Sequence, residues 1–326
     1  MGMLVEGRWI ADDRNYRAPT DGSGRFVREK TRFRDWVTAD GSSGFAPEPG
    51  RYHLYVSLAC PWAHRTLILR ALKGLDKAIP LSIVDPYMGV DGWAFSDGPG
   101  CIPDPVHGAR LLREIYLKAK PDYTGRVSVP VLWDKQRNTI VNNESAEIVR
   151  MFDTAFDALA ERPVSFCPEP LREKIDATRE ALFNAVNNGV YRAGFARTQD
   201  SYEEAVRDLF AALDHWEGVL GRQRYLLGDR ITEADWFFFT TLYRFDPVYV
   251  GHFKCNLRRL VDYPNLWNYT KELYQVPGVA GTCDLEHIKR HYYVSHESIN
   301  PTRVVPAGPL IDYATPHDRG RFAAAK

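Results

Sequence analysis

Cys60 stands where the sequence can make a thiol reactive. The apolar, β-prone segment 52–57 precedes it, and Pro61 follows at the start of an amphipathic helix expected over residues 61–74. Because proline is favoured at the first helical position, Cys60 is expected beside unpaired backbone N–H groups and the positive end of the helix dipole. Such surroundings favour the thiolate, which is the reactive form of cysteine. A single cysteine before a helix is more often a small buried hydrophobe, so other features must support a catalytic role.

The sequence holds Ala63 where a redox site of the Cys-x-x-Cys type would carry its second thiol. The order strand, Cys-Pro, helix resembles thioredoxin-type redox sites. A lone thiolate cannot close a local disulfide, so a mixed disulfide on Cys60 needs an external thiol to resolve it.

His64 follows Cys60 by one helical turn and could form a Cys–His pair or a metal site with it. No further ligands cluster nearby, so no metal site is expected. At this spacing the imidazole points deeper along the helix, which favours a structural role over that of a base. The five cysteines lie at positions 60, 101, 167, 255 and 283 and contain no Cys-x-x-Cys pair, which favours a reducing, cytoplasmic setting.

Composition narrows the range of partners. The 326 residues carry 42 Lys and Arg against 42 Asp and Glu, so there is no basic excess to indicate nucleic acid or an acidic membrane as a partner. The N-terminus lacks a signal-peptide pattern, and no apolar run reaches membrane-spanning length. The length allows two domains.

The elements that must position Cys60 follow from the pattern along the chain. We expect an extended, aromatic-anchored arm over 1–50, an α/β domain over 51–160, a helical domain over 170–300 and a surface tail over 301–326. The α/β domain shows a βα…ββα order, which gives a small mixed sheet with helices packed on it. Its stretch from about 86 to 126 is long for a connection and is expected to cover a site.

The helical domain carries a clear start signal. Thr232, followed three residues later by Asp235, forms a capping box ahead of the apolar run 236–239. We expect a buried helix to begin there.

Two further features lie at the ends of elements in the α/β domain, one at the start of a strand and one at the start of a helix. Val129-Pro130 begins a strand, where proline is tolerated as an edge or first residue, and an ordinary trans bond is the default. Glu144-Ser145 opens the next helix, where free N–H groups bind carboxylates and a glutamate can hold an ammonium group. The pair suits an α-amino acid such as the γ-glutamyl end of glutathione, although a plain N-cap is the better explanation when these two residues are taken alone.

Longer stretches resemble the glutathionyl-hydroquinone reductases, or Xi-class glutathione transferases. The similar segments are 57–65 (SLACPWAHR), 187–191 (NNGVY), 273–279 (LYQVPGV) and 287–293 (HIKRHYY). The resemblance implies a thioredoxin-like N-terminal domain with a cis bond at Val129-Pro130, a helical glutathione-transferase C-terminal domain, and a homodimer.

The same resemblance implies an activity. Members of the family remove glutathione from glutathionyl-hydroquinones through a mixed disulfide at the position of Cys60, and a second glutathione releases oxidised glutathione. Glutathione, a co-substrate here, is expected to contact Trp93, Arg126, Val129, Glu144 and Ser145. Tyr191 and Tyr292 are expected to bind the quinol oxygens, with Tyr293 as the alternative to Tyr292.

Two other functions stay open from sequence. An omega-like reductase of dehydroascorbate or small disulfides would share Cys60 but would not need Tyr191 and Tyr292. A non-catalytic binding module would keep the fold and lose the reactive thiolate, since fold alone does not establish function.

Overall fold

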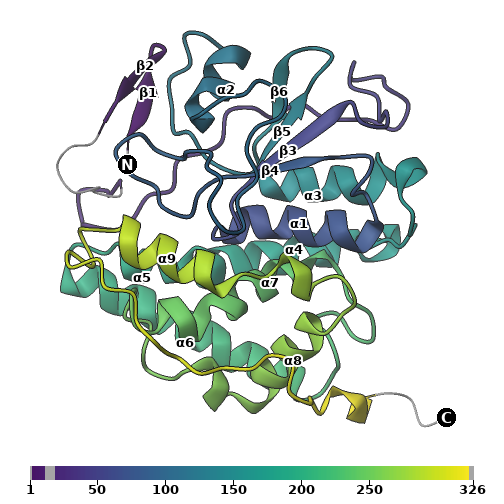
Figure 1. Cartoon of the computed structure of the whole chain (residues 1–326). Coiled ribbons are helices and arrows are strands. Elements are labelled where there is room, and N and C mark those ends of the chain that lie inside the picture. Colours follow the sequence, from purple (N-terminus) through teal and green to yellow (C-terminus); the bar gives the residue numbers. More distant parts are fainter. Residues whose placement is uncertain (1, 12–18, 323–326) are drawn as a thin grey trace. The chain divides into compact units, whose positions relative to one another are not determined.

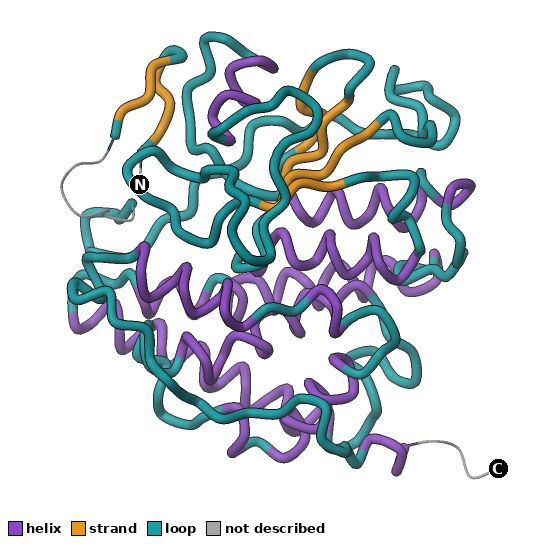
Figure 2. Tube along the Cα trace, in the orientation of Figure 1, coloured by secondary structure: helices purple, strands orange, loops and turns teal. Residues whose placement is uncertain are grey.

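The computed structural model describes residues 2–11 and 19–322, and the chain forms two compact units (Figures 1 and 2). The first unit comprises Met1–Arg17, Glu29–Val164 and Gly281–Val305. The second comprises Ala18–Arg28, Ser165–Ala280 and Pro306–Lys326. Residues 12–18 of the predicted arm and 323–326 of the predicted tail lie outside the described residues.

The first unit is built on a four-stranded mixed sheet in the order β4-β3-β5-β6. Its strands are β3 (Tyr52–Val56), β4 (Leu81–Ile83), β5 (Val131–Asp134) and β6 (Thr139–Asn142). β3 runs parallel to β4 and antiparallel to β5, and β5 and β6 form an antiparallel hairpin. All five residues of β3 are buried, as expected for a central strand covered on both faces.

Helices cover this sheet. They are α1 (Pro61–Lys73), α2 (Leu112–Ala119), α3 (Ser145–Thr154) and the short η1 (Asp157–Leu159). α1 and α3 pack against each other on one side of the sheet, and α2 lies on the other side, next to β6 (Figure 1). The unit therefore has the expected βα…ββα order and the layers of a thioredoxin-like domain.

The N-terminal arm contains a small hairpin that the sequence pattern did not predict. β1 (Met3–Val5) pairs with β2 (Arg8–Ile10). The turn between them places both Glu6 and Gly7 at positive φ, 47° and 75°. Backbone bonds in both directions between Leu4 and Gly125 fix the hairpin to the loop after α2.

The region predicted as helical, 170–300, includes α9 (Leu285–Ser295), which groups with the first unit. Polar side chains of α9 bond to the loop after β4. His287 Nε2 lies 2.7 Å from the Pro99 carbonyl, and the Ser295 hydroxyl accepts the Met88 N–H at 3.0 Å. Helical periodicity shows that α9 exists but not which neighbours bury it.

The second unit is helical. Its helices are α4 (Arg172–Leu182), α5 (Gly189–Gly194), α6 (Gln199–Leu220), α7 (Glu233–Arg244) and α8 (Pro264–Tyr274). Short turns link them, namely η2 (Glu169–Leu171), η3 (Phe183–Asn187), η4 (Phe245–Tyr249) and η5 (Leu260–Asp262). η3 and η4 are π-helical, a local geometry that is often found near functional sites.

The predicted capping box starts α7, the central helix of this unit. The Asp235 carboxylate accepts bonds from the backbone N–H and hydroxyl of Thr232, and also from the Leu226 N–H and the Tyr269 hydroxyl. Burial raises the pKa of the Asp235 carboxyl, and the four donors oppose that shift. Every residue of α7 is buried, so this helix forms the core of the second unit.

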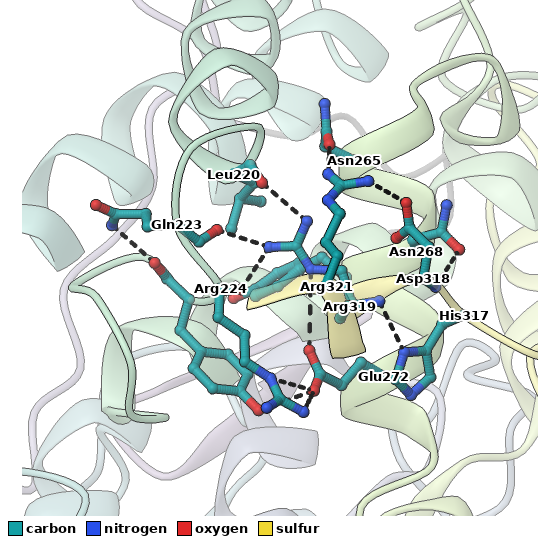
Figure 3. A network of polar contacts seen from close by, with 12 residues as sticks. Leu220, Gln223, Arg224, Asn265, Asn268, Glu272, His317, Asp318, Arg319 and Arg321 are labelled. Carbon is teal, nitrogen blue, oxygen red and sulfur yellow. Dashed lines mark hydrogen bonds and ion pairs between the residues drawn. The ribbon is translucent and has the colours of Figure 1, made fainter. Parts of the chain in front are cut away.

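The segment expected as a surface tail is anchored in the second unit (Figure 3). Tyr313 is buried, and Arg319 in the short helix η7 (Arg319–Phe322) is fully buried. The Arg319 guanidinium donates to the carbonyls of Leu220, Gln223 and Arg224 at 2.8, 2.8 and 2.6 Å. It also lies 3.9 Å from the carboxylate of Glu272.

The architecture predicted from the sequence, a thioredoxin-like α/β domain followed by a helical domain, is confirmed. Among the described residues, no helix is both long and apolar enough to span a membrane.

Arg319→Met should destabilise the second unit by about 3 kcal/mol, because three buried carbonyls lose a charged donor. The matched control is Arg321→Met. Arg321 bonds the exposed Asp318 and the half-buried Asn265, and pairs near the surface contribute little. Urea unfolding followed by circular dichroism should show a lower midpoint for Arg319→Met alone, and equal midpoints would contradict a role for Arg319 as an anchor.

Candidate active site

Cys60 is the N-cap of α1, as the sequence predicts. Its backbone is extended (φ −77°, ψ 120°) and Pro61 follows at the first helical position. The turn Ser57–Cys60 is closed by a Cys60 N–H to Ser57 carbonyl bond of 3.2 Å. Cys60 is partly exposed, whereas Ala63 is fully buried in the helix.

Val129 meets the thiol across the sheet. β5 pairs antiparallel with β3, with Val131 opposite Tyr55, so the residues before β5 lie near the strand end that leads to Cys60. The Cys60 Sγ lies 3.6 Å from the Val129 carbonyl oxygen. The Val129–Pro130 peptide bond is cis, the form that the fold assignment implies and that local sequence does not favour.

Glu144 and Ser145 occupy the N-terminus of α3. Glu144 is the N-cap, and its side chain accepts the Ala146 N–H at 3.3 Å. The Ser145 hydroxyl is buried and lies 3.5 Å from the Glu144 carboxylate. A carboxylate and a hydroxyl at a helix N-terminus can together hold the two charged groups of an α-amino acid.

Two residues that were not predicted as site residues contact this pair. The Thr31 hydroxyl, from the N-terminal arm, donates to the Glu144 carboxylate at 3.1 Å. Arg65 Nη1 lies 3.5 Å from the Ser145 hydroxyl, while its guanidinium lies 4.5 Å from the Trp62 ring centre. Arg65 therefore both packs on Trp62 and contacts the candidate site.

Trp93 and Tyr292 share one neighbour, His291. The Trp93 ring stacks on His291 at 4.8 Å and an interplanar angle of 21°. Tyr292 meets the same imidazole edge-on at 5.2 Å, and the His291 Nδ1 lies 2.9 Å from the Pro86 carbonyl. His291 was not singled out from sequence, although it lies in the quoted stretch 287–293.

Trp93 and Tyr292 are both buried, and so is Tyr293, the alternative to Tyr292. Trp93 lies in the long loop that was expected to cover a site.

Arg126 lies in the loop that leads to Val129. Its guanidinium is within 3.7 Å of the Glu29 carboxylate, and the side chain is 29% exposed. Arg126 therefore keeps a solvent-facing charge three residues from Val129.

Tyr191 belongs to the second unit, on α5. It is buried in an aromatic cluster formed with Phe26, Phe195, Tyr249 and Phe253, with ring centres 5.3 to 6.5 Å from its own.

His64 is fully buried, as its predicted structural role requires. Its Nε2 lies 2.9 Å from the Thr282 hydroxyl and 3.7 Å from the Cys283 Sγ. Over residues 2–11 and 19–322, no group of three or more His, Cys, Asp or Glu side chains is arranged to hold a metal ion.

Two protein-family models match the chain. Residues 59–155 match the glutathione S-transferase N-terminal domain, and residues 199–272 match the glutathione S-transferase C-terminal domain.

Full-length relatives are more specific. The glutathionyl-hydroquinone reductase YqjG of Escherichia coli is 50% identical over 98% of each chain. The glutathionyl-hydroquinone reductase PcpF of Sphingobium chlorophenolicum is 50% identical over 95% of this chain and 96% of its own.

Solved structures agree with these relatives. A Xi-class glutathione transferase from Natrialba magadii superposes with a TM-score of 0.93 at 52% identity, covering 99% of this chain and 98% of the other. The glutathione-bound structure of E. coli YqjG gives 0.89 at 48% identity, covering 98% and 99%.

Alkylation should separate Cys60 from Cys101, the matched control. Burial raises the pKa of the Cys101 thiol, so its thiolate forms only at a pH above the ordinary range for cysteine. At pH 7 we expect iodoacetamide to label Cys60 at the helix N-terminus and to leave Cys101 largely unlabelled, as measured by peptide mass spectrometry. If Cys60 and Cys101 were labelled equally, and both only as the pH approaches 9, the result would contradict a reactive thiolate at Cys60.

Proposed function

Because this chain belongs to the glutathionyl-hydroquinone reductases, the Xi class of glutathione transferases, we propose that it reduces glutathionyl-hydroquinones to hydroquinones and releases oxidised glutathione. It is a glutathione-dependent enzyme. The observation that carries the proposal is Cys60 at the N-terminus of α1, with its sulfur 3.6 Å from the carbonyl next to cis-Pro130. A thiolate there supports sulfur exchange rather than conjugation.

The first step transfers glutathione to the enzyme. The Cys60 thiolate attacks the glutathione sulfur of the substrate and forms the S–S bond of a mixed disulfide. Before this attack the ring takes its keto form, in which the neighbouring hydroxyl has lost its proton and the carbon that bears sulfur has gained one. When the carbon–sulfur bond breaks, its electron pair enters the ring as an enolate, whose oxygen takes a proton from water. The hydroquinone leaves reduced, and the two sulfurs are oxidised.

The second step restores the enzyme. A second glutathione loses its thiol proton, and its thiolate attacks the mixed disulfide. Oxidised glutathione leaves, and the electron pair of the broken bond returns to Cys60 as a thiolate. Ala63 supports this route because no second thiol of a Cys-x-x-Cys pair competes with the incoming glutathione.

The glutathione contacts follow the resemblance. Glu144 and Ser145 would bind the γ-glutamyl end at the N-terminus of α3, with Thr31 and Arg65 holding their side chains in place. The Val129 backbone would pair with the cysteinyl part, and Trp93 would pack over the tripeptide.

Arg126 would contact a carboxylate of glutathione. Tyr191 and Tyr292 would hydrogen-bond the quinol oxygens. A homodimer and a cytoplasmic setting stay predictions.

The decisive experiment gives the purified enzyme a glutathionyl-hydroquinone and excess glutathione, beside Cys60→Ala. We expect equal amounts of hydroquinone and oxidised glutathione from the wild type, and at least a 10³-fold lower rate from the variant, because the nucleophile is lost. Chromatography of the products measures both. Turnover of dehydroascorbate or small disulfides alone would favour the omega-like reading, and bound glutathione without turnover would favour a binding module.

Ser145→Ala should raise the KM for glutathione about tenfold, since a hydrogen bond to a charged group contributes roughly 1.5–3 kcal/mol. The matched control is Ser128→Ala, whose hydroxyl lies 3.5 Å from the buried Tyr116 hydroxyl. Steady-state kinetics with varied glutathione measures the effect. An unchanged KM in Ser145→Ala would remove Ser145 from the glutathione site.

A further inference from the structure

Part of the N-terminal arm belongs to the second unit and is hydrogen-bonded to its helices. The Ser23 carbonyl accepts bonds from the hydroxyls of Thr198 and Ser201, at 3.2 and 3.0 Å, at the start of α6. The Gly24 carbonyl accepts the Arg197 N–H at 3.2 Å. These bonds hold residues 19–28, the docked arm segment, beside α5 and α6.

The docked arm segment reaches Tyr191 with two side chains. The Phe26 ring stacks on Tyr191, with ring centres 6.5 Å apart and planes 30° apart. The Arg28 guanidinium carbon lies 4.7 Å from the Tyr191 ring centre and 5.3 Å from that of Phe26. A cation at this distance from an aromatic face interacts with its π system.

Arg28 is held in this position from the other side. Its Nε donates to the Asn188 side-chain oxygen at 2.7 Å, and Asn188 is the residue immediately before α5. The bond joins the guanidinium to the start of the short helix that carries Tyr191. The neighbouring cation Arg192 instead pairs with carboxylates of Glu204 and Asp208.

A guanidinium on a phenol ring changes what the phenol can do. Its positive charge stabilises the negative charge that develops on the phenol oxygen when the hydroxyl proton is shared with an acceptor, which makes the hydroxyl a stronger hydrogen-bond donor. Because Tyr191 is buried, water screens this interaction less than at the surface.

We propose that Arg28 is a positioning residue that strengthens the Tyr191 hydroxyl as a donor to the quinol oxygen, an inference that rests on the proposed function. The donor matters most when the carbon–sulfur bond of the keto form breaks, because the resulting enolate carries its negative charge on that oxygen. Substrates whose rings stabilise this charge poorly depend on Arg28 most. Electron-rich hydroquinones should therefore need it more than chlorinated ones.

The test is a double-mutant cycle on kcat with two substrates, the glutathione conjugates of methoxyhydroquinone and of trichlorohydroquinone. Arg28→Met should lower kcat for the methoxy conjugate about tenfold, in the range of a partly desolvated cation–π interaction, and for the chlorinated conjugate clearly less. In a Tyr191→Phe background the same substitution should have no further effect, because its route is removed.

Two further variants serve as controls. Arg28→Gln can keep the bond to Asn188 while removing the charge, so it should show the loss of kcat expected for Arg28→Met. It takes the place of Arg28→Met in the cycle if that variant folds poorly. Arg25→Met lies in the same docked arm segment and loses only the exposed ion pair with Glu204, so its kcat should match the wild type.

Each outcome separates this inference from the proposed function. No turnover by the wild type refutes both. Wild-type turnover with unchanged kcat in both Arg28 variants refutes only the role of Arg28. Losses that add to those of Tyr191→Phe, or that are equal for both substrates, would show that Arg28 merely supports the structure.

Discussion

The N-terminus of α1 is the constraint on which the first unit depends. A thiol there needs a strand that ends just before the helix, a turn that places it at the N-cap of the helix, and a neighbouring strand that approaches from the side. β3, the turn Ser57–Cys60 and the cis-Pro130 loop before β5 meet these three needs. The burial of β3 and the packing of α1 on α3 fix the helix relative to the sheet. The packing of that core therefore fixes the position of the Cys60 sulfur.

In the second unit, the main constraint is that charged side chains buried in a helical core need hydrogen-bond partners. Asp235 satisfies donors from two backbone positions and two side chains, and Arg319 satisfies three carbonyls near the end of α6. Both charges are buried, so each needs its full set of partners. The aromatic cluster around Tyr191 lies in the same unit.

Short sequence patterns predicted the features that depend on neighbouring residues, such as helix starts. The capping box Thr232-x-x-Asp235 and Pro61 after Cys60 identified helix starts to within a residue. The hairpin β1–β2 was missed because its strands have three residues each, although Glu6-Gly7 is a turn signal. The contact of His291 with Trp93, and that of Thr31 with Glu144, join residues far apart in sequence. No periodicity encodes such contacts, and the cis bond at Pro130 followed only from recognising the fold.

Ala63 is packed in α1 where a Cys-x-x-Cys site would have its second thiol. The redox state of Cys60 therefore depends on thiols outside the protein. With an internal partner, the site would have a reduction potential of its own and could store two electrons. In the proposed mechanism, with alanine there, a glutathionylated Cys60 would exchange only with external glutathione, so the fraction of enzyme in the mixed disulfide would follow the ratio of oxidised to reduced glutathione. The enzyme would then slow as that pool becomes oxidised, which makes its turnover a readout of cellular redox poise.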